Sequence, residues 1–157
     1  MENYLKILED SLQEKISVLE EISQYNQEQE ELLKKQDVSL EELDDNMSKK
    51  DELIEKLTGL DQGFESLYER IKEQLLGGKD AYKVQIKKLQ DLISQVTEQS
   101  VSIQAQEARN KKLVEKYFSE ERIQLKHDRQ TSKAAYNYYK NMSNTNVMPP
   151  QYMDQKK

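Results

Sequence analysis

The chain has 157 residues, of which 35% are hydrophobic and 34% are charged, and its net charge is -6. This apolar content is too low for a thick globular core, so the apolar side chains must lie along narrow stripes. Gly (4) and Pro (2) are scarce, which favours long helices over sheets and turn-rich folds. We therefore expect an all-α protein with the shape of an extended bundle or coiled coil.

The absence of Cys excludes a disulfide framework and a thiolate metal site. The first residues lack the basic start and apolar core of a signal peptide, and no apolar run approaches the ~20 residues of a membrane span. These features predict a cytoplasmic protein without stable membrane insertion.

The negative charge is unevenly distributed along the chain. Residues 126–157 carry six basic and two acidic side chains, a charge of +4, so the remaining residues carry -10. An acidic body with a weakly basic tail is a poor surface for phosphate groups. We therefore expect no nucleic-acid partner.

A first helix is predicted over residues 2–35. Its apolar residues recur at steps of three and four, the spacing that places side chains on one helical face. These residues are Leu5, Leu8, Leu12, Ile16, Leu19, Ile22 and Leu33.

A second helix is predicted over residues 39–76. Ser39 and Glu42 form a capping box, in which the Ser hydroxyl accepts from the Glu backbone N–H and the Glu carboxylate reaches back. Gly59 and Gly63 lie inside this helix, where each costs roughly 1 kcal/mol relative to Ala. Either close packing or a kink requires them, or the helix tolerates them.

A third helix is predicted over residues 79–127, after the Gly77-Gly78 break. Short connections make consecutive helices antiparallel, so we expect an elongated up-down-up three-helix bundle with a long third helix. This bundle domain would cover residues 1–127. Residues 128–157 would be a C-terminal helical extension that ends in a flexible tail, because Pro149-Pro150 cannot continue a helix.

The apolar stripes are interrupted by polar residues at one height of the predicted bundle. Counting from the turns places Asn26, Gln29, Lys50, Glu107 and Asn110 at the same level. If these side chains form a layer, Lys50 and Glu107 can pair there and fix the register at a cost in stability. The alternative is that the helices splay apart at this level and the residues are hydrated.

No catalytic constellation is present in the sequence. The single His127 has no Cys partner, and neither a Gly-rich phosphate loop nor a metal-ligand spacing occurs. We expect a protein that is not an enzyme and that uses no cofactor or metal.

The C-terminal region concentrates Tyr136, Tyr138, Tyr139 and Met142. Tyr buries a large area with little loss of rotamer freedom, and Met adapts to varied surfaces, so both residue types suit protein docking. The competing interpretation is that Tyr136 and Tyr139 extend the packed stripe of the third helix.

Five segments resemble FlgN-type flagellar export chaperones: residues 38–43 (VSLEEL), 50–57 (KDELIEKL), 60–70 (LDQGFESLYER), 138–142 (YYKNM) and 151–157 (QYMDQKK). The resemblance implies a chaperone that binds the C-terminal segments of hook-filament junction proteins, prevents their early assembly and delivers them to the type III export gate. It also implies that the C-terminal helical region holds the substrate and that a tyrosine docks on a gate component, for which Tyr136, Tyr138 and Tyr139 are candidates.

The far half of the third helix is expected to lack partners within its own chain, which leaves an apolar strip for a partner's amphipathic helix. The strip comprises Val114, Tyr117, Phe118, Ile123 and Leu125. The rival functions are a FliT-type chaperone for the filament cap, a self-associating structural coiled coil and, less favoured by the acidic body, a membrane-surface helix. The sequence leaves both a monomer and a homodimer open.

Overall fold

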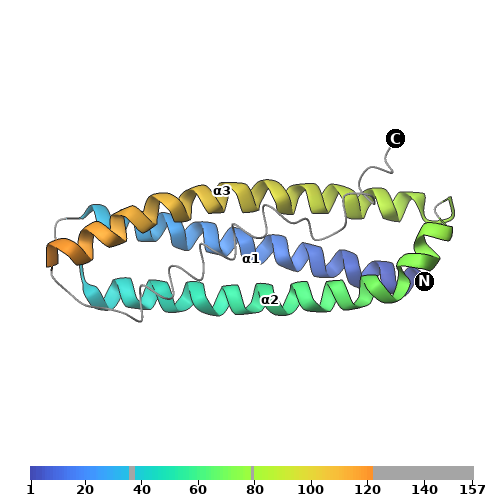
Figure 1. Cartoon of the computed structure of the whole chain (residues 1–157), viewed down its shortest axis with the longest axis horizontal. Helices are drawn as coiled ribbons and strands as arrows, with labels where there is room; N and C mark the ends of the chain where they lie inside the picture. The colour runs from blue at the N-terminus through green and yellow to red at the C-terminus, as the bar shows by residue number, and fades with distance from the viewer. Residues whose placement is uncertain (36–37, 79, 122–157) are drawn as a thin grey trace.

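The computed structural model describes residues 1–35, 38–78 and 80–121, and these residues form three helices without a strand. Helix α1 spans Glu2–Lys34, α2 spans Leu40–Gly77 and α3 spans Lys83–Glu121. The three helices lie lengthwise beside one another in an elongated bundle (Figure 1). The predicted all-α class is confirmed.

The chain reverses direction twice. The N-terminus and the α2–α3 connection lie at one end of the bundle, and the α1–α2 connection lies at the other end (Figure 1). Helices α1 and α3 therefore run parallel, with α2 antiparallel to both. This is the predicted up-down-up arrangement.

Local hydrogen bonds explain where the helices begin and end. The Ser39 hydroxyl accepts from the Glu42 N–H at 3.3 Å, which caps α2 as predicted. The predicted start of α3 at residue 79 is four residues too early, because the second reversal continues through Tyr82. Within it the Ala81 N–H donates to the Gly78 carbonyl, and regular bonding begins where the Ile86 N–H donates to the Tyr82 carbonyl. The expected helix end at residue 127 and the extension over 128–157 lie outside the described residues.

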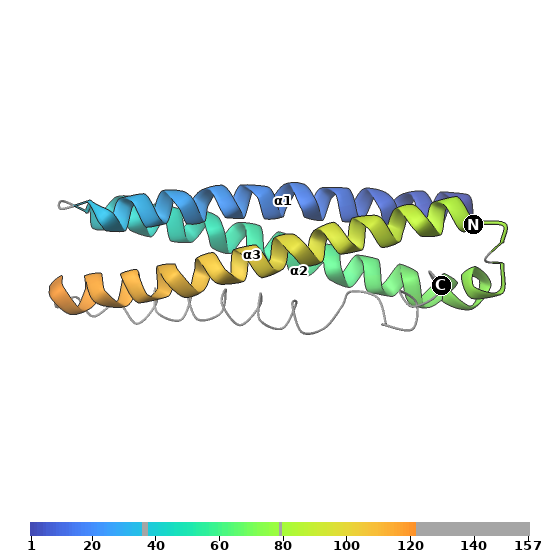
Figure 2. The same ribbon diagram turned by 90° about the horizontal axis from the view of Figure 1, so that it is seen from above.

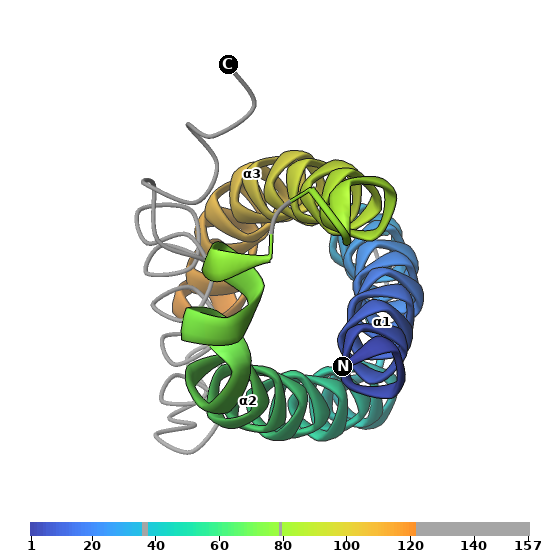
Figure 3. The same ribbon diagram turned by 90° about the vertical axis from the view of Figure 1, so that its right-hand side faces the viewer.

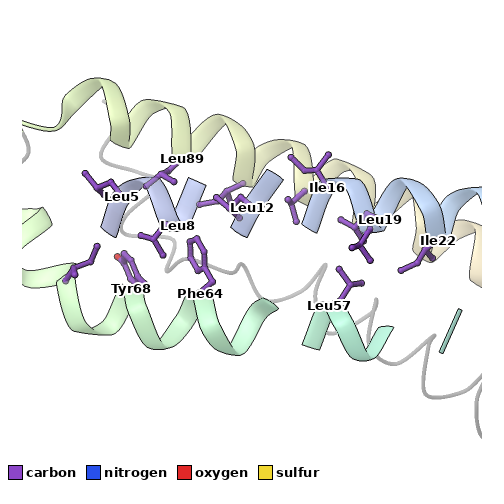
Figure 4. Close-up of a cluster of buried hydrophobic side chains, with 14 of the residues drawn as sticks. Leu5, Leu8, Leu12, Ile16, Leu19, Ile22, Leu57, Phe64, Tyr68 and Leu89 are labelled. Carbon is purple, nitrogen blue, oxygen red and sulfur yellow. The ribbon is translucent and has the colours of Figure 1, made fainter. Parts of the chain in front are cut away.

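Most buried apolar side chains form one group, here called the main cluster. Figure 4 shows how a row of leucines and isoleucines on α1 meets side chains from α2 and α3. Because α1 contributes residues at three- and four-residue steps, its buried apolar face is continuous from Leu5 to Ile22, about five turns. The main cluster comprises Leu5, Leu8, Leu12, Ile16, Val18, Leu19, Ile22, Leu57, Phe64, Tyr68, Ile71, Leu75, Leu89, Ile93, Val96 and Ile103.

A second and smaller group lies at the opposite end of the bundle. Helix α3 starts beside α1 and is tilted relative to it (Figures 1 and 2), so that its last described turns pack against the start of α2. Viewed along the bundle, α1 lies next to both other helices (Figure 3). Where α2 and α3 approach, Leu43, Met47, Val114 and Phe118 are buried together, with Leu33 and Tyr117 partly buried against them. We call this group the distal cluster.

The two glycines inside α2 are exposed and do not mark a close approach. A Cβ atom at Gly59 or Gly63 would meet no heavy atom within 4 Å, and α2 is continuous through both. Close packing therefore does not require these residues, and they do not interrupt the helix.

Candidate functional site

Polar side chains separate the main cluster from the distal cluster. On α1 the buried residues between Ile22 and Leu32 are Asn26 and Gln29. On α3 the buried residues between Ile103 and Val114 are Glu107 and Asn110. Lys50 occupies the corresponding buried position on α2, between Met47 and Leu57. The structure thus brings all five residues of the predicted layer together, and we refer to them as the polar layer.

An ion pair between α2 and α3 lies at the centre of this layer. The Lys50 Nζ atom is 2.9 Å from one Glu107 carboxylate oxygen and 3.1 Å from the other. Both side chains are almost completely buried, with exposed fractions of 6% and 4%. Lys50 also donates to Gln29 Oε1 at 3.3 Å, so the ammonium group joins all three helices.

Amide side chains extend the layer between α1 and α3. Asn110 Nδ2 donates to the Asn26 carbonyl at 2.8 Å and to Gln29 Oε1 at 3.0 Å. Asn26 Nδ2 in turn donates to Gln106 Oε1 at 3.2 Å. The contacts are those of a hydrogen-bonded layer rather than of splayed helices.

Three further residues belong to this network, and the sequence analysis did not select them. Gln106 Nε2 donates to Ser23 Oγ at 3.0 Å, and Asn46 Nδ2 donates to the Tyr25 carbonyl at 3.0 Å. Asn46 is 1% exposed and is adjacent to the buried Met47. Its position in the apolar stripe of the second helix could have identified it as a buried polar residue. Ser23 and Gln106 lie on the flanks of their helices, where periodicity does not distinguish them from solvated residues.

A buried charged layer adds little to the free energy of unfolding. Its main effect is to favour one helix register over the alternatives. Removing two charges from water costs several kcal/mol per ion, and the attraction between them often only offsets that cost. A helix shifted by one turn would leave Lys50 or Glu107 buried without its partner, at a cost of roughly 3–5 kcal/mol. The layer is therefore suited to setting the register of α2 against α3.

A second buried lysine lies beside the main cluster. Lys15 on α1 is 2% exposed and pairs with Asp61 on α2. Burial lowers the pKa of Lys15 from its ordinary value, even though the Asp61 carboxylate acts in the opposite direction. The cost of removing this ammonium group from water therefore exceeds its favourable interaction with the Asp61 carboxylate.

The expected partner-binding strip is only partly within the described residues. Val114 and Phe118 are 4% and 2% exposed and pack with Leu43 and Met47, so the expectation that this part of α3 lacks partners in its own chain is wrong. The tilt of α3 is the reason, because it carries these residues onto α2. Tyr117 is half-buried, with its hydroxyl 3.5 Å from the Val38 carbonyl. The other predicted residues lie outside the described residues: Ile123, Leu125, Tyr136, Tyr138, Tyr139 and Met142.

A metal site, an enclosed pocket or a membrane-spanning stretch would indicate functions of other kinds. No group of three His, Asp or Glu side chains among the described residues is placed to hold a metal ion. A groove of about 450 Å³ lies between α1 and α2, and its walls are mostly polar, with Glu21, Glu28, Glu52 and Lys49 among the lining residues. None of the three described helices has an apolar stretch that could cross a bilayer.

Comparison with known proteins identifies the family of the chain. The family model described as FlgN protein matches residues 1–144 of the 157 residues. No curated protein and no solved structure matches the chain significantly. The family match covers the whole described bundle and most of the C-terminal region. The chain belongs to the FlgN family of flagellar export chaperones.

Proposed function

We propose that this protein is a cytoplasmic chaperone for hook-filament junction proteins in flagellar type III export. It binds the C-terminal segments of these substrates through its own C-terminal helical region. It keeps them from assembling early and delivers them to a component of the export gate. The match of the FlgN family model to residues 1–144 carries this proposal.

The architecture supports a binding role of this kind. The three helices bury a continuous apolar face mainly along α1, which leaves long charged outer surfaces. In the proposal, residues 1–127 form the bundle and residues 128–157 form an extension that contributes to binding. Tyr117 would contact the substrate, together with Ile123, Leu125, Tyr136, Tyr138, Tyr139 and Met142 from the region that follows α3. Val114 and Phe118 are covered by α2 and would join this contact only when they are uncovered.

The first experiment is to measure complex formation with purified proteins. The full-length chain is examined by size-exclusion chromatography with light scattering, alone and mixed with individual hook-filament junction proteins or the filament cap protein. We expect a one-to-one complex with a junction protein. A complex with the cap protein alone would indicate the FliT-type function, and a stable homodimer that ignores every substrate would indicate a structural coiled coil.

Tyrosine substitutions then locate the binding region. Tyr136→Ala, Tyr138→Ala and Tyr139→Ala are compared with Tyr4→Ala, a matched control near the start of α1, where Tyr4 is 43% exposed. Because aromatic residues at the centre of an interface carry much of the binding energy, at least one C-terminal variant should weaken substrate or gate binding about tenfold or more. Affinities equal to that of Tyr4→Ala for all three variants would rule out the tyrosine cluster as the binding site.

A further inference from the structure

The polar layer lies between two separate clusters of buried apolar residues in the interior of the bundle. In α2 and α3 the buried residues change from apolar to polar at the same height and then back to apolar. The main cluster contains sixteen buried apolar residues, whereas the distal cluster contains four. Since apolar burial drives folding roughly in proportion to area, the distal cluster holds its part of the bundle much more weakly.

Separating the helices at the polar layer costs little free energy, because water can hydrate the polar groups that become exposed. The Oδ1 atoms of Asn26, Asn46 and Asn110 are buried and accept no hydrogen bond from any described residue. Lys50 and Glu107 gain hydration when they separate, which offsets part of the lost attraction. Each of these groups therefore opposes opening less than a packed apolar side chain would.

The position of the distal cluster allows it to open without disturbing the rest. It lies at the start of α2 and in the last described turns of α3, beyond the main cluster. Local opening in proteins follows such boundaries, because segments with few buried apolar contacts open at lower free energy than the whole domain unfolds.

We infer that the bundle opens at the polar layer, so that the last turns of α3 separate from the start of α2 while the main cluster stays closed. Opening exposes Val114 and Phe118, which are otherwise covered by Leu43 and Met47. The use of this motion rests on the proposed function, since these two residues belong to the proposed substrate-binding region. The layer then controls when that part of the surface is accessible to a partner's helix.

The test uses two matched cysteine variants of the full chain, which has no cysteine of its own. Val114→Cys places a thiol in the distal cluster, and Val96→Cys places one in the main cluster on the same helix. The two valines are similarly buried, with exposed fractions of 4% and 1%. Each variant is treated with a small aromatic disulfide reagent under native conditions, and the rate of thiol modification is measured.

We expect the Val114→Cys thiol to react at least about ten times faster than the Val96→Cys thiol, because local opening exposes only the former. Equal rates would overturn the inference. Amide hydrogen exchange of the unmodified protein gives the same comparison without a substitution. Residues 111–118 should exchange faster than residues 93–100, and equal protection of both segments would again overturn it.

A further variant separates opening at the layer from fraying at the end of α3. Lys50→Met with Glu107→Leu replaces the ion pair by apolar side chains and joins the two clusters. In this background the Val114→Cys thiol should react at least about five times more slowly. An unchanged rate would show that the layer does not control the opening.

Adding a junction-protein segment distinguishes this inference from the proposed function. A C-terminal peptide of a hook-filament junction protein should protect the Val114→Cys thiol if Val114 lies in the substrate site. Rapid modification with no protection by the peptide would leave the opening established and would remove Val114 from the proposed site. Slow modification with a tightly bound peptide would overturn the opening and leave the chaperone function in place.

Discussion

The two apolar clusters differ in how they join the three helices. The main cluster runs along α1 and receives side chains from α2 and α3 over most of the bundle length. The distal cluster joins α2 directly to α3 and is separated from the rest by a charged, hydrogen-bonded layer. Uninterrupted helices can therefore enclose an apolar core that is divided into separate clusters.

The largest effect is expected from breaking the ion pair of the polar layer. Lys50→Met leaves the Glu107 carboxylate buried without a cation, and we expect a loss of about 3–5 kcal/mol in the free energy of unfolding. Adding Glu107→Leu should restore most of this loss. Denaturant titration followed by circular dichroism measures both variants. A single variant as stable as the double variant would mean that the pair is not buried in solution.

The second-largest effect on stability is expected when one leucine of each cluster is replaced by alanine. Leu19 and Leu43 are both 0% exposed, in the main and distal clusters respectively. Leu19→Ala should reduce the free energy of global unfolding by about 2–5 kcal/mol. Leu43→Ala should reduce it less and should instead accelerate amide exchange in residues 40–47 and 111–118. Similar global losses would mean that the two clusters unfold as one unit.

A smaller effect of opposite sign is expected at Lys15, beside the main cluster. Burial lowers the pKa of this ammonium group despite Asp61, so the charged form destabilises the folded state. Because the Asp61 side chain is 30% exposed and stays hydrated without Lys15, Lys15→Met should stabilise the protein by about 1 kcal/mol near neutral pH. Thermal denaturation measures this change, with the partly exposed pair Lys56 and Glu14 as a site for the control variant Lys56→Met.

The stability difference between Lys15→Met and the wild-type protein should also depend on pH. The lowered pKa means that the unfolded chain holds the Lys15 proton more strongly, so the contribution of Lys15 to the free energy of unfolding becomes more favourable as pH rises toward the ordinary value of 10.5. The extra stability of Lys15→Met relative to wild type should therefore decrease as pH rises from the lowered pKa of Lys15 to 10.5. An advantage that stays constant up to pH 10.5 would contradict the lowered pKa.

The smallest effect is expected from the exposed glycines of α2. A Cβ atom meets nothing within 4 Å at either Gly59 or Gly63, so Ala can replace each without a clash. Gly59→Ala and Gly63→Ala should each add up to about 1 kcal/mol of stability, because Ala loses less backbone freedom in a helix. A decrease in the melting temperature of either variant would show that the glycine has a role in packing.

The sequence by itself determined the three helices, their antiparallel order and the height of the polar layer. Apolar residues at three- and four-residue steps have only one periodic structure that buries them together, and short connections permit only adjacent antiparallel helices. The levels of Asn26, Lys50 and Glu107 followed from helical rise alone, because distance along a helix is fixed by residue count.

Tertiary structure alone decided which side chains pair across the helices. Lys15 falls among apolar neighbours in the sequence, but a long lysine stem can equally carry its charge to water, so its burial beside Asp61 was not predictable. Val114 and Phe118 were expected to lack partners within their own chain, and the tilt of α3 buries them on α2 instead. Helical periodicity specifies which face of a helix is apolar. The angle at which two helices cross depends on how all their side chains pack at once, and that decides what covers the face.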